Sequence, residues 1–143
     1  MFATFLLLLL TAVSGIKCTS LVQPPVLVVK PGESFSVPCK ITGYSATSTC
    51  TNWIRHKSGR PLEWIGWYCS SSNTRSIDSL KNKIHFSAEA SSNSVILHGQ
   101  NFQSEDTAVY YCAREESSWG IFAYWGKGTQ VTVTSAVQSA PKS

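Results

Sequence analysis

The chain has 143 residues, of which 14% are charged and 11% aromatic, and its formal net charge is +4. This length suits one domain of ordinary size and leaves little room for a second. The positive charge is mild and scattered, and no cluster of basic residues is denser than Lys81 and Lys83. We therefore predict no nucleic-acid partner. Five cysteines and five tryptophans are typical of a compact, aromatic-rich extracellular domain.

The first 18 residues differ in composition from the rest. Residues 5–10 form an apolar run, and small and polar residues follow through Gly15. Because this run is too short to span a bilayer, we predict that residues 1–18 are a secretory signal peptide. Cleavage is expected after Cys18, with a cut after Gly15 as the alternative. Removal of Lys17 with the leader lowers the formal charge from +4 to +3.

Short alternating runs begin at Leu21 and predict an all-β domain, because no stretch of ten residues shows a helical period. At residues 35–41, apolar side chains alternate with side chains expected to face solvent, so one face of that strand is apolar. Pro38 lacks an N–H and predicts a gap in the hydrogen-bond ladder. Further strands are expected at residues 51–56, 62–69, 83–86, 94–98, 108–114 and 124–134. This spacing fits two packed sheets with Greek-key connections.

Four cysteines follow the predicted leader: Cys39, Cys50, Cys69 and Cys112. Four cysteines allow three pairings in an oxidising compartment, and their chemistry alone does not choose among them. The chain also has three histidines: His56, His85 and His98. Because these histidines are dispersed and no Cys-x-x-Cys spacing exists, no metal site is predicted. No nucleophile elbow or phosphate loop is present, so neither an enzyme nor a cofactor is predicted.

The spacing of two of these cysteines resembles that of immunoglobulin variable domains. Cys39 lies fourteen residues before Trp53, and residues 106–112 read Asp-Thr-Ala-Val-Tyr-Tyr-Cys. The resemblance runs from about residue 21 to residue 135. It implies a V-type immunoglobulin β-sandwich of two antiparallel sheets with Greek-key topology.

The resemblance assigns structural roles to several residues. It implies that Cys39 and Cys112 bridge the two sheets and that Trp53 packs in the core against this bond. Tyr110 is placed to form a tyrosine corner, in which its hydroxyl returns to upstream backbone. Asp106 is placed to pair with two basic residues, Lys83 and Arg55.

Two further segments are similar to those of antibody heavy chains. Residues 125–129, Trp-Gly-Lys-Gly-Thr, resemble a heavy-chain joining segment, and residues 62–66, Leu-Glu-Trp-Ile-Gly, resemble the second framework. The chain is therefore identified as a member of the heavy-chain variable domains, with residues 19–135 as the domain and 136–143 as a truncated constant-region start or linker. Its framework is similar to those of bony fishes. A T-cell or innate receptor domain and a structural adhesion domain are the alternatives, which downstream sequence would separate.

The resemblance implies that three loops at one end of the sandwich bind antigen, at roughly residues 43–52, 67–75 and 115–124. Their aromatic, Ser and Asn content suits recognition. Trp119 is the best candidate for an anchor, whereas Phe122 and Tyr124 are expected to pack near the loop base. The residues expected to contact antigen, whose identity is not readable, are Tyr44, Thr49, Trp67, Tyr68, Ser70, Asn73, Arg75, Glu115, Glu116, Ser118, Trp119 and Ile121.

A second surface, which is apolar, is expected to meet a partner, because a lone monomer gains little from exposing so much apolar area together. The resemblance implies that this partner is a light-chain variable domain. Leu62 and Trp64 argue against a single-domain heavy chain. The chain is expected to be secreted or at the cell surface, with any membrane attachment through missing downstream segments. The residues expected at this interface are Ile54, His56, Leu62, Trp64, Tyr111 and Trp125.

Several positions depart from the family pattern. Ala123 replaces an Asp that often pairs with the arginine at the start of the third loop. Arg114 is therefore expected to lose that partner, with Glu115 or Glu116 as candidates to replace it. Gly99 stands where a large apolar residue is usual, which predicts a thinner core.

Cys50 and Cys69 form a further departure. The family's geometry puts these two positions side by side on neighbouring strands, in the first and second hypervariable regions. We predict a second disulfide between them, because unpaired thiols are uncommon in secreted domains. A free thiol pair and a bond to a partner are the alternatives.

Overall fold

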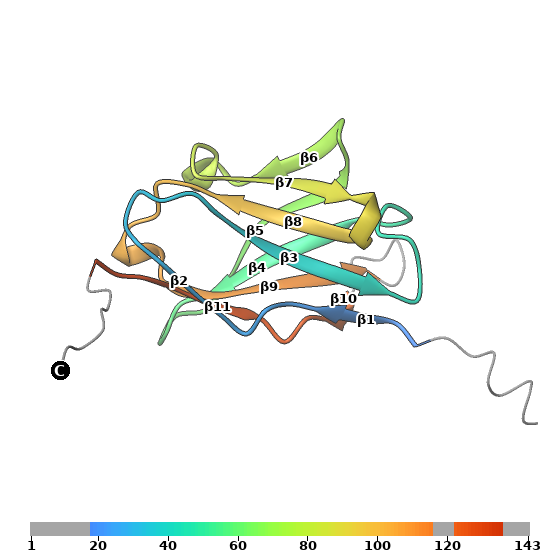
Figure 1. The fold of residues 1–143 in the computed structure, drawn as a ribbon, viewed down its shortest axis with the longest axis horizontal. Helices are drawn as coiled ribbons and strands as arrows, with labels where there is room; N and C mark the ends of the chain where they lie inside the picture. The colour runs from blue at the N-terminus through green and yellow to red at the C-terminus, as the bar shows by residue number, and fades with distance from the viewer. Residues whose placement is uncertain (1–17, 116–121, 136–143) are drawn as a thin grey trace, which may run out of the picture.

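The computed structural model describes residues 18–115 and 122–135, which form a β-sandwich (Figure 1). The predicted leader up to residue 17 and the tail 136–143 lie outside this range. The strands are β1 (Ser20–Val22), β2 (Val26–Val29), β3 (Phe35–Thr42), β4 (Thr51–His56), β5 (Leu62–Ser70), β6 (Asn73–Ser76), β7 (Ile84–Glu89), β8 (Ser94–Gly99), β9 (Ala108–Glu115), β10 (Phe122–Trp125) and β11 (Thr129–Val133).

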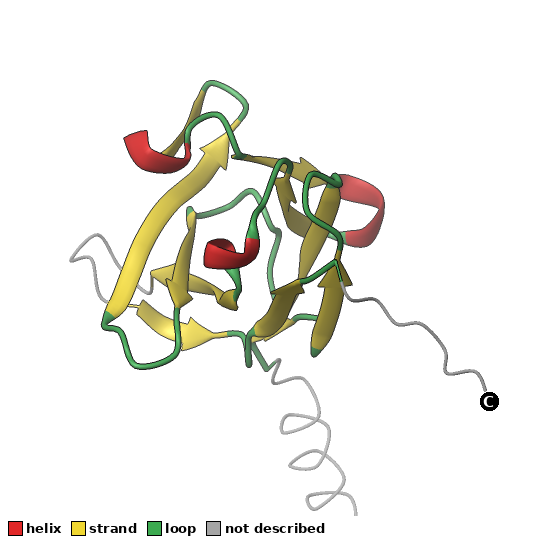
Figure 2. Ribbon diagram, turned by 90° about the vertical axis from the view of Figure 1, so that its left-hand side faces the viewer, coloured by secondary structure: helices red, strands yellow, loops and turns green. Residues whose placement is uncertain are grey.

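The strands form two sheets, which appear as separate layers when the sandwich is viewed from one end (Figure 2). One sheet has the order β1-β3-β8-β7, and the other has the order β2-β11-β9-β4-β5-β6, with β10 also paired to β9. The pairing of β2 with β11 is parallel, whereas the other pairings are antiparallel. The predicted all-β, V-type sandwich is confirmed.

Short 3-10 helices connect some of the strands: η1 (Asp78–Leu80), η2 (Ala90–Ser92) and η3 (Ser104–Asp106). Within the described part of the chain, no helix is long and apolar enough to cross a membrane. The single strand predicted at residues 124–134 is in fact two, β10 and β11. Gly126 and Gly128 lie between them, and Gly128 has a φ of 92°, which is outside strand geometry and favours glycine.

The core contains the predicted covalent link between the sheets. A disulfide joins Cys39 on β3 to Cys112 on β9, 73 residues apart. Trp53 on β4 is completely buried and stacks on Phe86 of β7, with 5.9 Å between ring centroids. The alternation of β3 buries Val37 and Cys39 and leaves Pro38, which lies between them, exposed. The predicted bridge and the buried indole are therefore confirmed.

Asp106 is the centre of a buried ionic network at one end of the sandwich. Its carboxylate accepts hydrogen bonds from Lys83 Nζ at 2.7 Å, Arg55 Nη1 at 3.3 Å and the backbone N–H of Gln103 at 3.0 Å. Burial alone raises the pKa of Asp106, but these hydrogen bonds and the Lys83 charge outweigh it and hold the pKa below its usual value. The predicted pairing of Asp106 with both basic residues is confirmed.

Tyr110 forms the predicted tyrosine corner. Its hydroxyl donates to the backbone oxygen of Asp106 at 2.7 Å and accepts from Arg55 Nη1 at 3.2 Å. Burial raises the pKa of Tyr110 to about 12, although the neighbouring guanidinium opposes that rise. The hydroxyl therefore stays neutral at physiological pH and can keep donating to the backbone.

One predicted weakness of the framework is corrected by the structure. Gly99 does not thin the core, because the ring of Phe35 on the paired strand fills the space that a side chain at Gly99 would take. Phe35 also meets Phe102 edge-on, with centroids 4.8 Å apart. Pro38 has no N–H to donate, and the register of β3 against β8 nevertheless runs unbroken from Phe35 to Lys40. Because β1 pairs only with residues 40–42, Pro38 lies where β3 has a free edge.

Candidate binding site

Three chain segments converge at one end of the sandwich, on the right in Figure 1. Thr51, the first residue of β4, pairs with Tyr68 near the end of β5 and with Arg114 near the end of β9. The three segments beyond these positions therefore lie side by side, although they are far apart in the sequence. This end is the candidate binding site.

A second disulfide ties the first of these segments to the second. Cys50, just before β4, is bonded to Cys69 on β5, 19 residues later. The bond confirms the predicted pairing and removes the free-thiol and partner-bond alternatives for this structure. Cys18 is the one free cysteine among the described residues, and it is exposed.

The base of the third segment is held by Arg114 in an unexpected way. Its Nε donates to Thr49 Oγ1 at 2.7 Å, and its guanidinium lies 3.2 Å from the centre of the Tyr44 ring. Among the described residues, the partners of Arg114 in place of the missing Asp are thus a hydroxyl and an aromatic face. Burial raises the pKa of the Tyr44 hydroxyl, and the Arg114 charge opposes that rise.

Of the two glutamates expected to replace the Asp, Glu115 has another partner, and Glu116 lies outside the described residues. Glu115 accepts a hydrogen bond from Asn52 Nδ2 at 3.4 Å, and Asn52 also accepts from Trp64 Nε1 at 3.0 Å. Asn52 is a buried polar residue that the sequence analysis did not single out. Its position on β4, between β5 and β9, is what lets it join the third segment to the apolar face beside it.

The second segment presents aromatic and polar groups together. The Trp67 ring stacks on Trp64 with 5.3 Å between centroids, and Trp67 Nε1 donates to Asn73 Oδ1 at 3.1 Å. Ser70, Asn73 and Arg75 are exposed. Tyr68 is only 7% exposed and belongs to the core, because it points to the opposite face of β5 from Trp67. The expectation that Tyr68 contacts antigen is therefore withdrawn.

Residues of the third segment fall into two groups. Glu116, Ser118, Trp119 and Ile121 lie outside the described residues. Tyr124 is half-buried against the core, and Phe122 meets Trp125 edge-on with centroids 5.8 Å apart. Both aromatic residues pack at the base of the segment, as expected.

An apolar face lies on the sheet beside the binding end. Leu62 is 59% exposed, Trp125 43% and Trp64 41%. Tyr111 meets Trp125 edge-on, with centroids 6.1 Å apart. Ile54, however, is only 4% exposed, because it lies in the middle of the sheet with Tyr111 and Trp64 as its cross-strand neighbours. Ile54 therefore lies between these two neighbours on the same side of the sheet and contributes almost no exposed surface, which corrects the prediction.

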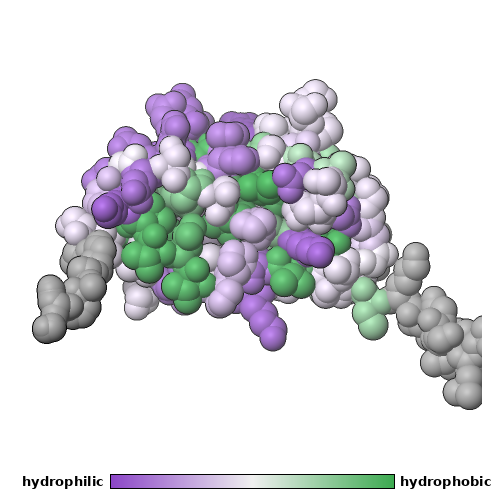
Figure 3. Space-filling model, in the orientation of Figure 1, coloured by the Kyte–Doolittle hydropathy of each residue, from purple (hydrophilic) through white to green (hydrophobic). Residues whose placement is uncertain are grey.

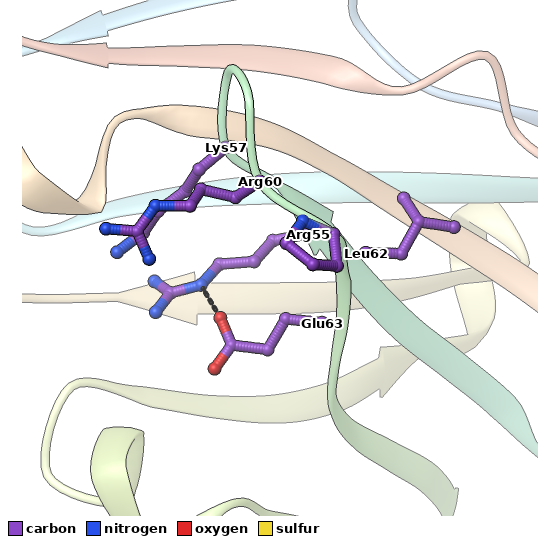
Figure 4. Close-up of a pocket in the computed structure, with 6 residues that line it drawn as sticks. Arg55, Lys57, Arg60, Leu62 and Glu63 are labelled. Atoms are coloured by element: carbon purple, nitrogen blue, oxygen red, sulfur yellow. Dashed lines mark hydrogen bonds and ion pairs between the residues drawn. The ribbon is translucent and has the colours of Figure 1, made fainter.

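Two surface features lie away from the candidate site. Apolar side chains gather over β2 in Figure 3, where Val26 and Val28 are each 60% exposed. At the end of the sandwich opposite the site, basic side chains line a pocket of about 290 Å³ (Figure 4). In this pocket Arg55 Nε donates to Glu63 Oε1 at 2.6 Å. No group of three or more metal-ligating side chains occurs among residues 18–115 and 122–135.

Comparisons with known proteins agree with this architecture. The family model of the immunoglobulin V-set domain matches residues 22–134. The Ig heavy chain V region XIG14 of Xenopus laevis is 43% identical over 75% of this chain and 79% of its own length. The mouse (Mus musculus) Ig heavy chain V region MOPC 315 is 41% identical over 91% and 96%. The IgW heavy chain V region W26 of Heterodontus francisci is 39% identical over 82% and 98%. Because these identities are so alike, the similarity to bony-fish frameworks stays a prediction.

Proposed function

Because this chain belongs to the immunoglobulin V-set family and is the variable domain of an antibody heavy chain, we propose that it binds antigen through the three converging segments and pairs with a light-chain variable domain. The observation that carries the proposal is the convergence of the three segments at one end, where Trp67 lies beside exposed polar groups. A rigid indole supplies contact area at low entropic cost, and Ser and Asn supply adaptable hydrogen bonds.

The proposed antigen contacts are the residues around this end. In the second segment they are Trp67, Ser70, Asn73 and Arg75; in the first they are Tyr44 and Thr49. Because Arg114 engages both Tyr44 and Thr49, these two residues contribute chiefly by holding the base of the third segment. The third segment contributes Glu115 and, among the residues not described, Glu116, Ser118, Trp119 and Ile121.

The test of antigen binding uses the heavy–light heterodimer on arrays of proteins and glycans. For every arrayed protein or glycan that the heterodimer binds, Trp67→Ala and Arg75→Ser are each expected to weaken the affinity at least tenfold, a free-energy loss of about 1.4 kcal/mol. Lys57→Ser, at the opposite end of the sandwich, is the control and leaves binding unchanged. Binding that depends on Lys57 and ignores Trp67 would contradict the proposal.

The apolar face formed by Leu62, Trp64, Tyr111 and Trp125 supports the proposed pairing. Two tryptophans and a leucine are exposed on one sheet face, and exposing this much apolar area to water is unfavourable for a lone domain. Apolar patches of this kind therefore mark interfaces. His56, half-buried on the same sheet, is proposed to lie at this interface, where it replaces a Gln common in the family. Ile54 is proposed to act by packing between Tyr111 and Trp64 on the same face.

Pairing is tested with two variants that add the same charge at equally exposed apolar positions. Leu62→Glu changes the proposed interface, and Val28→Glu changes a residue of similar exposure, 60% against 59%, on β2. Co-expressed with light-chain variable domains, the Leu62→Glu variant is expected to lose heterodimer in size-exclusion chromatography, while Val28→Glu retains it. A free domain that stays monomeric at high concentration without a light chain would count against the pairing.

We also propose that residues 1–18 are removed as a leader and that the domain of residues 19–135 is secreted or displayed at the cell surface. Mass spectrometry of the secreted product is expected to find Thr19 at its amino terminus. An amino terminus at Ile16 would place the cut after Gly15 instead.

A further inference from the structure

Two histidines that are thirteen residues apart in the chain meet on the outer face of the four-stranded sheet. The antiparallel pairing of β7 with β8 places His85 directly opposite His98. Their rings are stacked, with 4.5 Å between centroids and 9° between planes. The sequence analysis treated the histidines as dispersed, but this strand pairing makes two of them neighbours. His56, on β4 of the other sheet, stays apart.

The pair is accessible to solvent. Ile84, Phe86 and Leu97, which precede or follow the histidines along β7 and β8, are buried in the core. Because side chains alternate along a strand, the two histidines point to the outside, where His85 is exposed and His98 is half-buried. Ser36 on β3 is the cross-strand neighbour of His98 and leaves the other side of the pair open.

Charged groups on this face do not compete for the pair. Lys40 and Glu89 both pair with Ser94, at the other end of the strands from His98. The ammonium of Lys83, just before β7, is held by Asp106. An approaching cation therefore meets imidazole rings and hydroxyls at this place, with no adjacent free cation on the three strands.

A serine beside the pair orients one of the rings. Ser87 Oγ lies 2.8 Å from His98 Nε2. When that nitrogen donates its proton to the hydroxyl, Nδ1 carries the free lone pair. Partial burial and then the neighbouring His85 lower the pKa of His98. Histidines that ligate metals typically donate their other N–H to such an acceptor, which sets the tautomer.

We propose that His85 and His98 together bind a divalent transition-metal ion such as Zn²⁺, with water completing the coordination shell. Neutral imidazoles suit zinc, copper and nickel, whereas magnesium and calcium prefer oxygen ligands. On binding, the exposed His85 ring turns so that one nitrogen of each ring faces the ion, at about 2.0–2.1 Å. Two ligands on adjacent strands make an open, exchangeable site. It differs from a closed structural zinc site, which has four protein ligands.

The test is a titration of the domain beginning at Thr19, prepared without a polyhistidine tag, with ZnCl₂ and in parallel with MgCl₂. Histidine ring signals are followed by ¹H–¹³C NMR, and affinity is measured by calorimetry. Zn²⁺ is expected to shift the ring signals of His85 and His98 together and to leave those of His56 in place. Mg²⁺ is expected to shift none of them. Saturating Zn²⁺ that leaves both signals unmoved would overturn the proposal.

Variants then separate this pair from general histidine binding. His85→Gln and His98→Gln are each expected to abolish the calorimetric signal, whereas the matched control His56→Gln retains it. Ser87→Ala is expected to weaken Zn²⁺ affinity about tenfold, because the ring loses the partner that sets its tautomer. All four positions are outside the core, so metal-free unfolding midpoints should match the unmodified domain. Wild-type Zn²⁺ affinity in His85→Gln would also reject the site.

Discussion

Replacing Cys50 and Cys69 together with alanine removes the cross-link between the first two segments of the binding end. The bond closes a chain segment with a sequence separation of 19 residues. Loop-closure entropy for a loop of this length corresponds to about 3 kcal/mol of stability, because the unlinked unfolded chain has more conformations to lose on folding. Both side chains are half-buried, so the truncation itself adds little cavity cost.

The assay is equilibrium unfolding in urea, followed by tryptophan fluorescence. The free energy of unfolding is expected to fall by about 3 kcal/mol, out of roughly 5–15 kcal/mol for a domain of this kind. The denaturant slope should rise, since an unlinked unfolded chain exposes more surface. The intact Cys39–Cys112 bond limits this rise, because its loop encloses the smaller one.

Two comparisons make the reasoning refutable. Cys50→Ala alone should cost as much as the double variant, because either change removes the same bond. Ser70→Ala, next to the disulfide and exposed, should change stability by less than about 0.5 kcal/mol. A loss below about 1 kcal/mol in the double variant would refute the chain-entropy estimate for this loop.

Three further outcomes are expected. Asp106→Asn leaves the buried Arg55 without one carboxylate and should cost about 3 kcal/mol in urea unfolding. Burial raises the pKa of Asp106, but its hydrogen bonds lower that pKa more strongly, so the folded pKa lies below the ordinary value of 3.8. The wild type should therefore lose the stability contributed by the Asp106 carboxylate as pH falls below 3.8, whereas Asp106→Asn should show no such loss. Tyr110, with a pKa of about 12, should ionise late in a 295 nm titration, with stability lost as pH rises from 10 to 12. Because burial also raises the pKa of Tyr44, a late step whose amplitude is undiminished in Tyr110→Phe would contradict the assignment. Gly99→Ala should cost about 1–3 kcal/mol in thermal unfolding by displacing the Phe35 ring, and Phe35→Leu should restore part of that loss.

The features that the sequence predicted correctly depend on local pattern or on motifs of fixed spacing. Alternation along residues 35–41 predicts which side chains of β3 are buried, because successive side chains of any strand point to opposite faces. The family motif around Cys112 likewise indicates its bond to Cys39 and the corner at Tyr110. The pairing of Cys50 with Cys69 followed from the same framework, which places the two positions on adjacent strands.

The predictions that failed concern which side chain fills a space or accepts a bond. Gly99 suggests a thin core until the register brings Phe35 across from it. Arg114 contacts Thr49 and Tyr44 because the first segment lies against the end of β9. The residues next to Arg114 in the sequence do not predict this contact. Short edge strands such as β6 also went unpredicted, since four residues carry too little periodicity to identify a strand.

By itself, the sequence determined the all-β class, because strand periodicity is a property of the chain, and its resemblance to a known family implied the disulfides and the end at which the variable segments meet. Only the tertiary structure decided which residues of that set reach solvent. Tyr68 is buried because it belongs to the core, and Ile54 is buried between Trp64 and Tyr111 on the central strand of its sheet. The tertiary structure also decided that the rings of His85 and His98 are in contact. The packing of whole strands sets the cross-strand register, which the number of residues between the two histidines does not reveal.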